Sequence, residues 1–517
     1  MDLFIKNASI VNGIGKSIFK ANVGIKEDKI IYIGQENFSS KITINANELI
    51  LTPGFIDTHS HSDFTIIADP QAEGKITQGI TTEINGNCGL SAFPMLEETL
   101  ERRLPELKAL GLPKWNSIDE YISLLKNVNP SINFATLCGH GNIRGSVIGY
   151  KNVIADKAKL SKMRNLLKKQ FFYKVKGLST GLIYPPGIFA NTEELIEFAK
   201  VLHPNKGVYA THLRSEGERL ISALEEAILI GKKAKIPIHI SHLKTSGREN
   251  WWKIDTVLSL IESAQREGIK ITADSYPYTA SATDLDVFLP QWIIEGSRED
   301  IVSRLKRESI RKEIAKYIKT RGKNFLDSLL ISEVAFEKDR DFEGKKLGDI
   351  TKFENAHNFI CDLLIRSDLY VAVIYFGMSE ENLIKILSKP YVVIGTDSSS
   401  RSTKGITARG KPHPRGFGSF PRFIRKYVLE KEILSLEEAI RKITYLPAKI
   451  FKIHKRGLIK EGYYADIVLF DPSEIEDTAT FENPFGISKG IKYVIINGKI
   501  AVENGLITDI RNGRILL

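Results

Sequence analysis

Two histidines separated by a single serine, His59 and His61, end an apolar segment that begins at Pro53. Side chains alternate between the two faces of a strand, so residues two apart point the same way and these imidazoles converge. Neutral imidazole is a common metal ligand. The pair alone fits a structural or surface role equally well, so it predicts a metal site only if other ligand-type residues join it.

Ligand-type residues recur at the ends of later strand-like segments. They are Cys88, His212, His242 and Asp397. With the first pair they make four histidines, one thiol and one carboxylate, a donor set that suits zinc or a similar divalent ion. A lone buried histidine is more often a structural residue, but agreement among five strand ends favours a metal centre.

Cys88 and Asp397 each fit more than one role. Cys88 ends its segment between glycines, where backbone approaches a ligand closely, and coordination would make its thiol a thiolate. Cys138 and Cys361 lack such a setting and are expected to be core residues. Asp397 fits a metal ligand, a base that takes a proton from water at the metal, or a residue that hydrogen-bonds a loop. We favour a base that also contributes to metal binding.

The order of strand-like and helical patterns predicts the fold class. Residues 55–450 contain eight strand-like segments that alternate with helical patterns, which is typical of an α/β protein with a (β/α)8 barrel. Residues 285–390 lie between the seventh and eighth segments and predict an inserted helical subdomain. The β-rich residues 1–54 and 451–517 predict one small β-sandwich built from both ends of the chain. Active sites of such barrels lie at the carboxyl ends of the strands, where the ligand-type residues stand.

Composition excludes several classes of protein. The chain has 517 residues and a net charge of +11, from 73 basic and 62 acidic side chains. Lysine and glutamate are intermixed without a basic stripe that contains aromatics, so nucleic-acid binding is not expected. No apolar run reaches the length of a membrane span and the first residues do not resemble a secretion signal, so no membrane partner is expected. Three cysteines are too few for a disulfide framework and indicate a cytoplasmic location.

Several longer motifs carry a resemblance to a known family. They include PGFIDTHSHSD, QGITTEINGNCGLSAFP, STGLIYPPG, THLRSEGE, ISHLKTSG, ADSYPYTASAT, IGTDSSS and HPRGFGSFPR. In this order they resemble the N-acyl-D-amino-acid deacylases, or D-aminoacylases, of the metal-dependent amidohydrolase superfamily. NGNCG, THLRSEGE and HPRGFGSFPR are far more selective than His-x-His. The resemblance implies the barrel-plus-sandwich fold and hydrolysis of a small-molecule N-acyl-D-amino acid to a D-amino acid and a carboxylate.

The resemblance also implies roles for single residues. A tight zinc would be held by Cys88, His212 and His242. A second, weaker metal position would use His59, His61 and Asp397, with Cys88 as a further ligand that the two positions could share, and Asp397 would be the catalytic acid and base. The substrate carboxylate would be bound by Arg415 with help from Tyr278, and Lys244 would lie on the substrate side. The family serine near that carboxylate is replaced by Ala282, and Ser398 stands where some members have glycine, so the preferred substrate side chain stays open.

Two other functions are weighed against this one. A cyclic-amide hydrolase of the hydantoinase or dihydroorotase type shares the fold, but commonly bridges two metals with a carboxylated lysine from the fourth strand. The corresponding segment, GLSTGLIYPPG, has no lysine, while Cys88 offers a thiolate. A non-catalytic barrel protein would be expected to lose ligands or the base, and all are present. A homo-oligomer is compatible with the sequence, which does not decide it.

Overall fold

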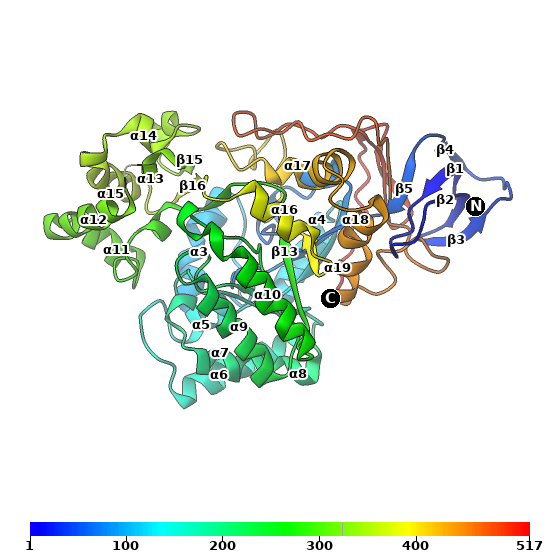
Figure 1. Ribbon diagram of the computed structural model, residues 1–517. Coiled ribbons are helices and arrows are strands. Elements are labelled where there is room, and N and C mark those ends of the chain that lie inside the picture. The colour runs from blue at the N-terminus through cyan, green and yellow to red at the C-terminus, as the bar shows by residue number, and fades with distance from the viewer. Residues whose placement is uncertain (323) are drawn as a thin grey trace.

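The computed structural model describes residues 1–322 and 324–517. Figure 1 shows a central α/β body, an inserted lobe around α11–α15 on its left, and a β-rich part with the N-terminus on its right. No helix in the described part of the chain is both long and apolar enough to span a bilayer.

Parallel strands form the centre of the molecule. One three-stranded sheet is made of β6 (Phe55–Asp57), β7 (Ile80–Asn85) and β8 (Asn133–Thr136). A six-stranded sheet has the order β17 (Val392–Ile394), β13 (Ile271–Ser275), β12 (Ile238–Ile240), β11 (Val208–His212), β10 (Gly177–Gly181) and β9 (Cys138–Gly139). All pairs within both sheets are parallel. The predicted α/β fold with parallel strands is therefore confirmed.

Helices lie between these strands in sequence. Outside the insertion they are α1 (Thr65–Ala68), α2 (Glu73–Ile76), α3 (Glu97–Ala109), α4 (Ile118–Val128), α5 (His140–Val147), α6 (Lys157–Phe171), α7 (Thr192–Ala199), α8 (Leu202–Asn205), α9 (Leu220–Ala234), α10 (Ile254–Arg266) and α16 (Glu380–Ser388). After β17 come α17 (Arg415–Arg422), α18 (Leu436–Ile443) and α19 (Tyr445–Ile450). In α10, Ile254, Val257, Leu258 and Ile261 are buried. Their helical spacing gives one apolar face, which explains why this segment packs as a helix against the sheet.

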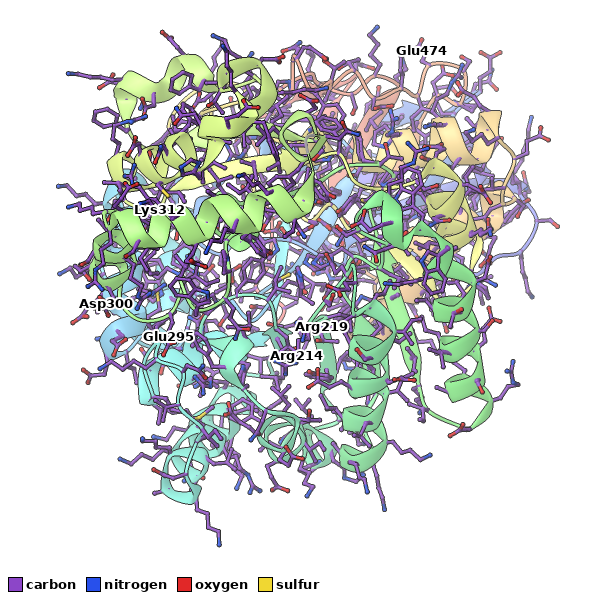
Figure 2. All side chains as sticks on the ribbon, turned by 60° about the vertical axis from the view of Figure 1, so that its left-hand side comes forward. Arg214, Arg219, Glu295, Asp300, Lys312 and Glu474 are labelled. Atoms are coloured by element: carbon purple, nitrogen blue, oxygen red, sulfur yellow. The ribbon has the colours of Figure 1, made fainter. Side chains whose placement is uncertain are left out.

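The insertion between β13 and β17 has its own apolar core, which includes Ile314, Ile360 and Val373. Its helices are α11 (Arg298–Leu305), α12 (Glu308–Arg321), α13 (Asn324–Asp327), α14 (Leu347–Ile350) and α15 (Ala356–Arg366). It also contains an antiparallel sheet of β14 (Ser281–Asp284), β16 (Val371–Tyr375) and β15 (Leu329–Val334). The sequence predicted a helical insertion here and did not predict this additional sheet. In Figure 2 the insertion, marked by Lys312, comes forward above Arg214 and Arg219, which follow β11.

Strands from both ends of the sequence form one nine-stranded sheet. The early strands are β1 (Leu3–Ile10), β2 (Phe19–Lys26), β3 (Lys29–Gly34), β4 (Ile42–Asn45) and β5 (Ile50–Pro53). The late strands are β18 (Ile467–Phe470), β19 (Ile491–Ile496), β20 (Lys499–Glu503) and β21 (Leu506–Ile507). The two groups meet where β5 pairs antiparallel with β18. Asn497 and Gly498 turn the chain between β19 and β20 with positive φ, as an Asn-Gly hairpin requires.

Candidate metal centre and active site

The carboxyl ends of the parallel strands place the candidate ligands at one edge. His212 is the last residue of β11, while His59 and His242 each come two residues after β6 and β12. Cys88 follows β7 and Asp397 follows β17, each by three residues. Since parallel strands end at the same edge of a sheet, residues far apart in sequence converge here.

The Cys88 thiol lies at the centre of three imidazoles. Its Sγ is 3.3 Å from His59 Nε2, 3.4 Å from His242 Nε2 and 3.7 Å from His212 Nδ1. Two zinc ligands at the usual S and N bond lengths and a tetrahedral angle would be about 3.6 Å apart. The donor atoms of Cys88, His212 and His242, the residues predicted to hold the tight zinc, therefore have a spacing that suits one zinc ion.

Asp397 and His61 extend the cluster beside this position. Asp397 Oδ1 is 3.1 Å from His61 Nε2 and 3.5 Å from His59 Nε2. Metal-type donor atoms also come together in the groups His59–His61–Cys88 and His59–His242–Asp397. The geometry thus provides donors for two adjacent metal positions that share residues.

Three of these residues have an unusual backbone conformation. Cys88, His242 and Asp397 have φ values of 52°, 34° and 50°, in the left-handed region that residues with a side chain rarely adopt. Such conformations cluster at functional sites, where the surrounding structure maintains them. At Gly181 a Cβ would lie 2.1 Å from the Cys88 carbonyl oxygen, so glycine there allows β10 to approach the thiol segment.

Charges at the site favour the ionised forms of the Cys88 thiol and the Asp397 carboxyl. Burial opposes ionisation of Cys88, but the imidazoles of His59 and His242 outweigh it and hold the pKa of the thiol well below its usual value. Burial also opposes ionisation of Asp397, and Arg415 followed by His242 and His59 lower the pKa of that carboxyl well below its usual value. A thiolate and a carboxylate are the forms that bind a metal cation.

Two carboxylates that the sequence analysis missed orient the imidazoles. Asp274 Oδ2 lies 3.2 Å from His59 Nδ1, and Asp274 Oδ1 accepts the His242 backbone N–H at 2.8 Å. Glu216 Oε1 lies 2.9 Å from His242 Nδ1. Carboxylates that hold the second ring nitrogen fix the ligand's orientation and tautomer. Glu216 stands four residues after His212, and Asp274 lies near the end of β13. Closeness to a predicted ligand and position at a strand end could therefore have marked these two carboxylates as candidates.

Arg415 lies at the first position of α17 and reaches the cluster. It is 5% exposed. Its Nη1 is 2.9 Å from Asp397 Oδ2, which is ion-pair distance, but it makes no well-aligned hydrogen bond to any described residue. Its guanidinium lies over the ring of Tyr276, 4.6 Å from the ring centre. A buried guanidinium with unused donors beside a metal centre is suited to hold a carboxylate.

Tyr276, rather than Tyr278, is the tyrosine that contacts Arg415. The hydroxyl of Tyr278 instead lies 3.5 Å from Asp477 Oδ2, and its ring lies under Arg422 at 4.7 Å. The predicted role of Tyr278 in holding the substrate carboxylate stays a prediction. The backbone N–H of Tyr278 donates to the Tyr276 carbonyl, a tight turn that removes the same-face relation a strand would give.

The structure also places the remaining candidates. Lys244 is buried and its Nζ contacts Glu216 Oε1 at 2.5 Å and His242 Nδ1 at 2.8 Å, so it lies beside the predicted ligands. Another buried histidine, His140, directly follows β9, and its Nε2 is 3.0 Å from Glu194 Oε1. Cys138 and Cys361 are buried, and burial raises the pKa of both thiols.

Tyr184 is a further residue that the sequence analysis did not single out. It follows β10, and its ring packs edge-on against His212 with 5.2 Å between ring centres. Its hydroxyl lies 3.1 Å from Thr283 Oγ1 on β14. The insertion therefore contributes β14 to the surroundings of the metal-type cluster, which consists of His59, His61, Cys88, His212, His242 and Asp397.

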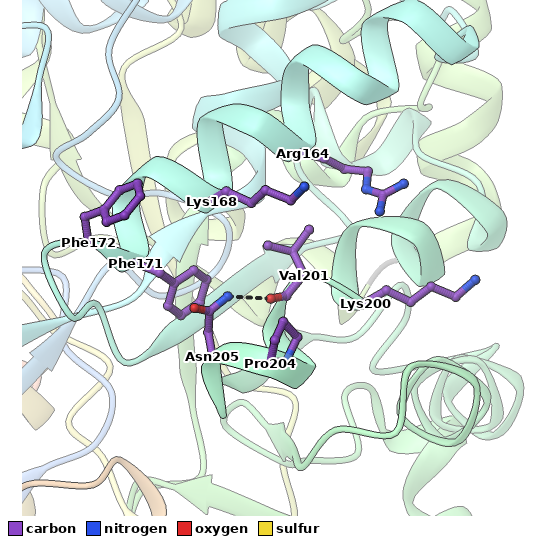
Figure 3. Close-up of a pocket in the computed structure, with 8 residues that line it drawn as sticks. All are labelled: Arg164, Lys168, Phe171, Phe172, Lys200, Val201, Pro204 and Asn205. Atoms are coloured by element: carbon purple, nitrogen blue, oxygen red, sulfur yellow. Dashed lines mark hydrogen bonds between the residues drawn. The ribbon is translucent and has the colours of Figure 1, made fainter.

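A surface pocket of about 410 Å³ lies elsewhere, on α6, α8 and the residues that join α7 to α8 (Figure 3). Its lining includes Arg164, Lys168 and Lys200. Arg164 and Lys200 both contact Glu197, which neutralises part of their charge. None of its lining residues belongs to the histidine and cysteine cluster, so this pocket is not the candidate active site.

Comparisons with known proteins agree with this geometry. Two models described as "Amidohydrolase family" match residues 43–327 and 360–501. D-aminoacylase from Alcaligenes xylosoxydans xylosoxydans is 32% identical, over 100% of this chain and 97% of its own length. N-acyl-D-glutamate deacylase from the same organism is 30% identical, over 100% and 96%.

Solved structures give the same result. N-acyl-D-glutamate deacylase from Bordetella bronchiseptica, in complex with zinc and a phosphonate mimic of the tetrahedral intermediate, superposes with a TM-score of 0.83. It is 28% identical and the match covers 100% of this chain and 99% of that one. A D-hydantoinase reaches a TM-score of 0.56 at 16% identity over 100% and 98%, which shows a shared fold alone. The chain belongs to the amidohydrolase family, in the group formed by D-aminoacylase and the N-acyl-D-amino-acid deacylases.

Proposed function

We propose that this protein is a zinc-dependent hydrolase that cleaves the amide bond of N-acyl-D-amino acids and releases a D-amino acid and a carboxylate. The observation that carries the proposal is the convergence of one thiol and two imidazoles on a point beside Asp397 and Arg415. A metal-binding group, a proton carrier and a carboxylate-binding group thus lie together, as this reaction requires.

Zinc would be held tightly by Cys88, His212 and His242. When bound, it polarises the amide carbonyl and increases the acidity of water. His59, His61 and Asp397 would form the second, weaker position. D-aminoacylase has a binuclear metal centre in which one metal activates and the second attenuates, and we extend that arrangement to this chain.

Asp397 would move the proton in this reaction. As a carboxylate it takes a proton from the attacking water and then delivers it to the nitrogen of the leaving amine. Its low pKa keeps it ionised before the reaction begins. Arg415 would bind the substrate carboxylate next to the scissile amide, and Tyr276 beneath it fixes the guanidinium. Lys244, which contacts His242, would lie on the side of the site where the substrate binds.

Arg415→Ala should lower kcat/KM for N-acyl amino acids by about 10- to 150-fold. Hydrogen bonds to charged groups contribute about 1.5–3 kcal/mol, and the variant loses the donors for the substrate carboxylate. Steady-state kinetics should be measured with an acid substrate and with the same compound as a neutral amide, for which the loss should be smaller, because only the effect of Arg415 on Asp397 then remains. Arg422→Ala, on the same helix but paired with Asp477, is the matched control. Equal losses for acid and amide would make Arg415 structural.

A substrate screen tests the proposed function itself. N-acetyl-D-amino acids, their L-enantiomers and five- or six-membered cyclic amides should be offered to one zinc-loaded preparation. We expect hydrolysis of the D-compounds. Activity confined to cyclic amides would favour the hydantoinase-type alternative, and activity confined to L-compounds would exclude the stereochemical part of the proposal.

We also infer the finer architecture that fits this function. The two parallel sheets would close into one (β/α)8 barrel, because only Leu137 separates β8 from β9 and a parallel bridge joins Ser60 to Ser398. Residues 55–450 would form the catalytic barrel, and residues 1–54 and 451–517 the β-sandwich.

A further inference from the structure

Lys75, on α2, is a lysine with no exposed surface that lies beneath the metal-type cluster. Its Nζ has four oxygen atoms within 3.0 Å: Asp57 Oδ2 at 2.7 Å, Thr396 Oγ1 at 2.7 Å, the Ser398 carbonyl at 2.8 Å and Ser60 Oγ at 3.0 Å. Burying an ammonium group is costly unless its charge and donors are satisfied, and here they are.

The partners of Lys75 are the chain neighbours of the candidate ligands. Asp57 and Ser60 flank His59 in sequence, and Thr396 directly precedes Asp397. Asp57 Oδ1 accepts the backbone N–H of Thr396 at 2.8 Å and that of His59 at 3.2 Å. One ion pair therefore joins the segment after β6 to the segment after β17.

Glu83, on β7, extends this buried network. It lies 3.9 Å from the Lys75 ammonium and accepts hydrogen bonds from the hydroxyls of Ser60 and Ser62, both at 2.8 Å. Lys75 is thus the cation between two buried carboxylates, Asp57 and Glu83. Without it, both would be left with uncompensated charge, and the strand ends they support would have to move.

We propose that Lys75 is a positioning residue that holds His59, His61 and Asp397 in place, and with them the second metal position and the proton carrier. The inference rests on the proposed function for its catalytic part. Two of the three tight-set residues lie outside this network, because Glu216 orients His242 and His212 ends β11. None of the recorded polar partners of Lys75 among the described residues belongs to the tight set.

Lys75→Met keeps the length and apolar stem of the side chain and removes the ammonium. Loss of a residue that orients metal-site groups typically costs about 10- to 100-fold in activity or metal affinity. We expect kcat to fall by that factor while KM for an N-acetyl-D-amino acid changes little. Elemental analysis should still find one zinc per chain, and calorimetric titration with additional Zn²⁺ should show weakened binding of the second equivalent.

Lys442→Met is the matched control. Lys442 is equally buried and donates to the carbonyls of Leu387 and Lys389, on α16 and after it, away from the ligands. It should lower thermal stability without changing kcat or second-site zinc binding. If both variants lose kcat only in proportion to lost stability, or if Lys75→Met keeps wild-type kcat and zinc binding, the positioning role is wrong.

Thr396→Val covers the case in which Lys75→Met does not fold. It removes one partner of the Lys75 ammonium at nearly constant shape. It should therefore lower kcat and the binding of the second zinc equivalent by less than Lys75→Met does. Where both variants fold, the losses in the double variant should be less than additive, because the Thr396 hydroxyl and the Lys75 ammonium contact each other and share Asp57 Oδ2; fully additive losses would contradict this. The zinc titration needs no substrate, so it tests Lys75 even if the wild type fails to hydrolyse N-acyl-D-amino acids.

Discussion

Asp397→Asn should reduce kcat by about 10²–10⁴-fold, the usual cost of losing a general acid or base. The amide keeps the shape of the carboxylate but cannot take up the proton from water at neutral pH. Cys88, His212 and His242 are unchanged, so we expect the tight zinc and the fold to persist. Turnover, zinc content and thermal denaturation measured on one preparation separate these effects.

Asp339→Asn is the control for this substitution. Asp339 is 7% exposed and pairs with Arg366 at 2.7 Å, so it is a buried aspartate with an arginine partner, as Asp397 is, but it lies in the insertion. It should change stability and leave kcat near the wild-type value. Near-normal turnover in Asp397→Asn would exclude the carboxylate as the proton carrier.

Cys88→Ser should remove the tight zinc and, with it, nearly all activity. The thiolate contributes the ligand atom on which the three imidazoles converge, and a serine hydroxyl at neutral pH is a much weaker donor for zinc. Loss of residues that merely orient ligands costs about 10- to 100-fold in metal affinity, so loss of a ligand itself should cost at least as much. Zinc per chain after dialysis against a chelator is the direct measurement.

Cys361→Ser provides the comparison, since Cys361 is a buried thiol on α15 of the insertion. It should retain both zinc and activity. Full activity of Cys88→Ser after chelation, or of wild-type protein freed of metal, would contradict the assignment of zinc to this position.

The parts of the site that follow from the geometry of strands were predictable from the sequence. Residues two apart on a strand share a face, and ends of parallel strands share an edge, so His59, His61, His212 and His242 were expected to meet. Which tyrosine of Tyr276-Pro277-Tyr278 contacts Arg415 was not predictable from this rule, because it depends on a tight turn in which the Tyr278 N–H donates to the Tyr276 carbonyl.

Other features depended on contacts between distant segments. Lys75 reads in the sequence as one lysine among many, and its role follows only from its burial against residues some 320 positions away. The sheet in the insertion was missed because helical patterns dominate that stretch and its strands pair across up to about ninety residues. Periodicity within a segment does not encode such pairings.

The nine-stranded sheet has a consequence for how the protein matures on the ribosome. Every candidate ligand lies between residues 59 and 397, but β5, which leads directly into β6, gains its antiparallel partner only when β18 has been synthesised. Residues 514 and 516 then pair with Phe134 on β8. A nascent chain therefore contains all the candidate metal-binding side chains before the strands that position them have all their pairing partners. Zinc should be acquired stably only after residues 467–516 have left the exit tunnel, so synthesis that stops short of them should leave a chain that neither holds the metal nor turns over substrate.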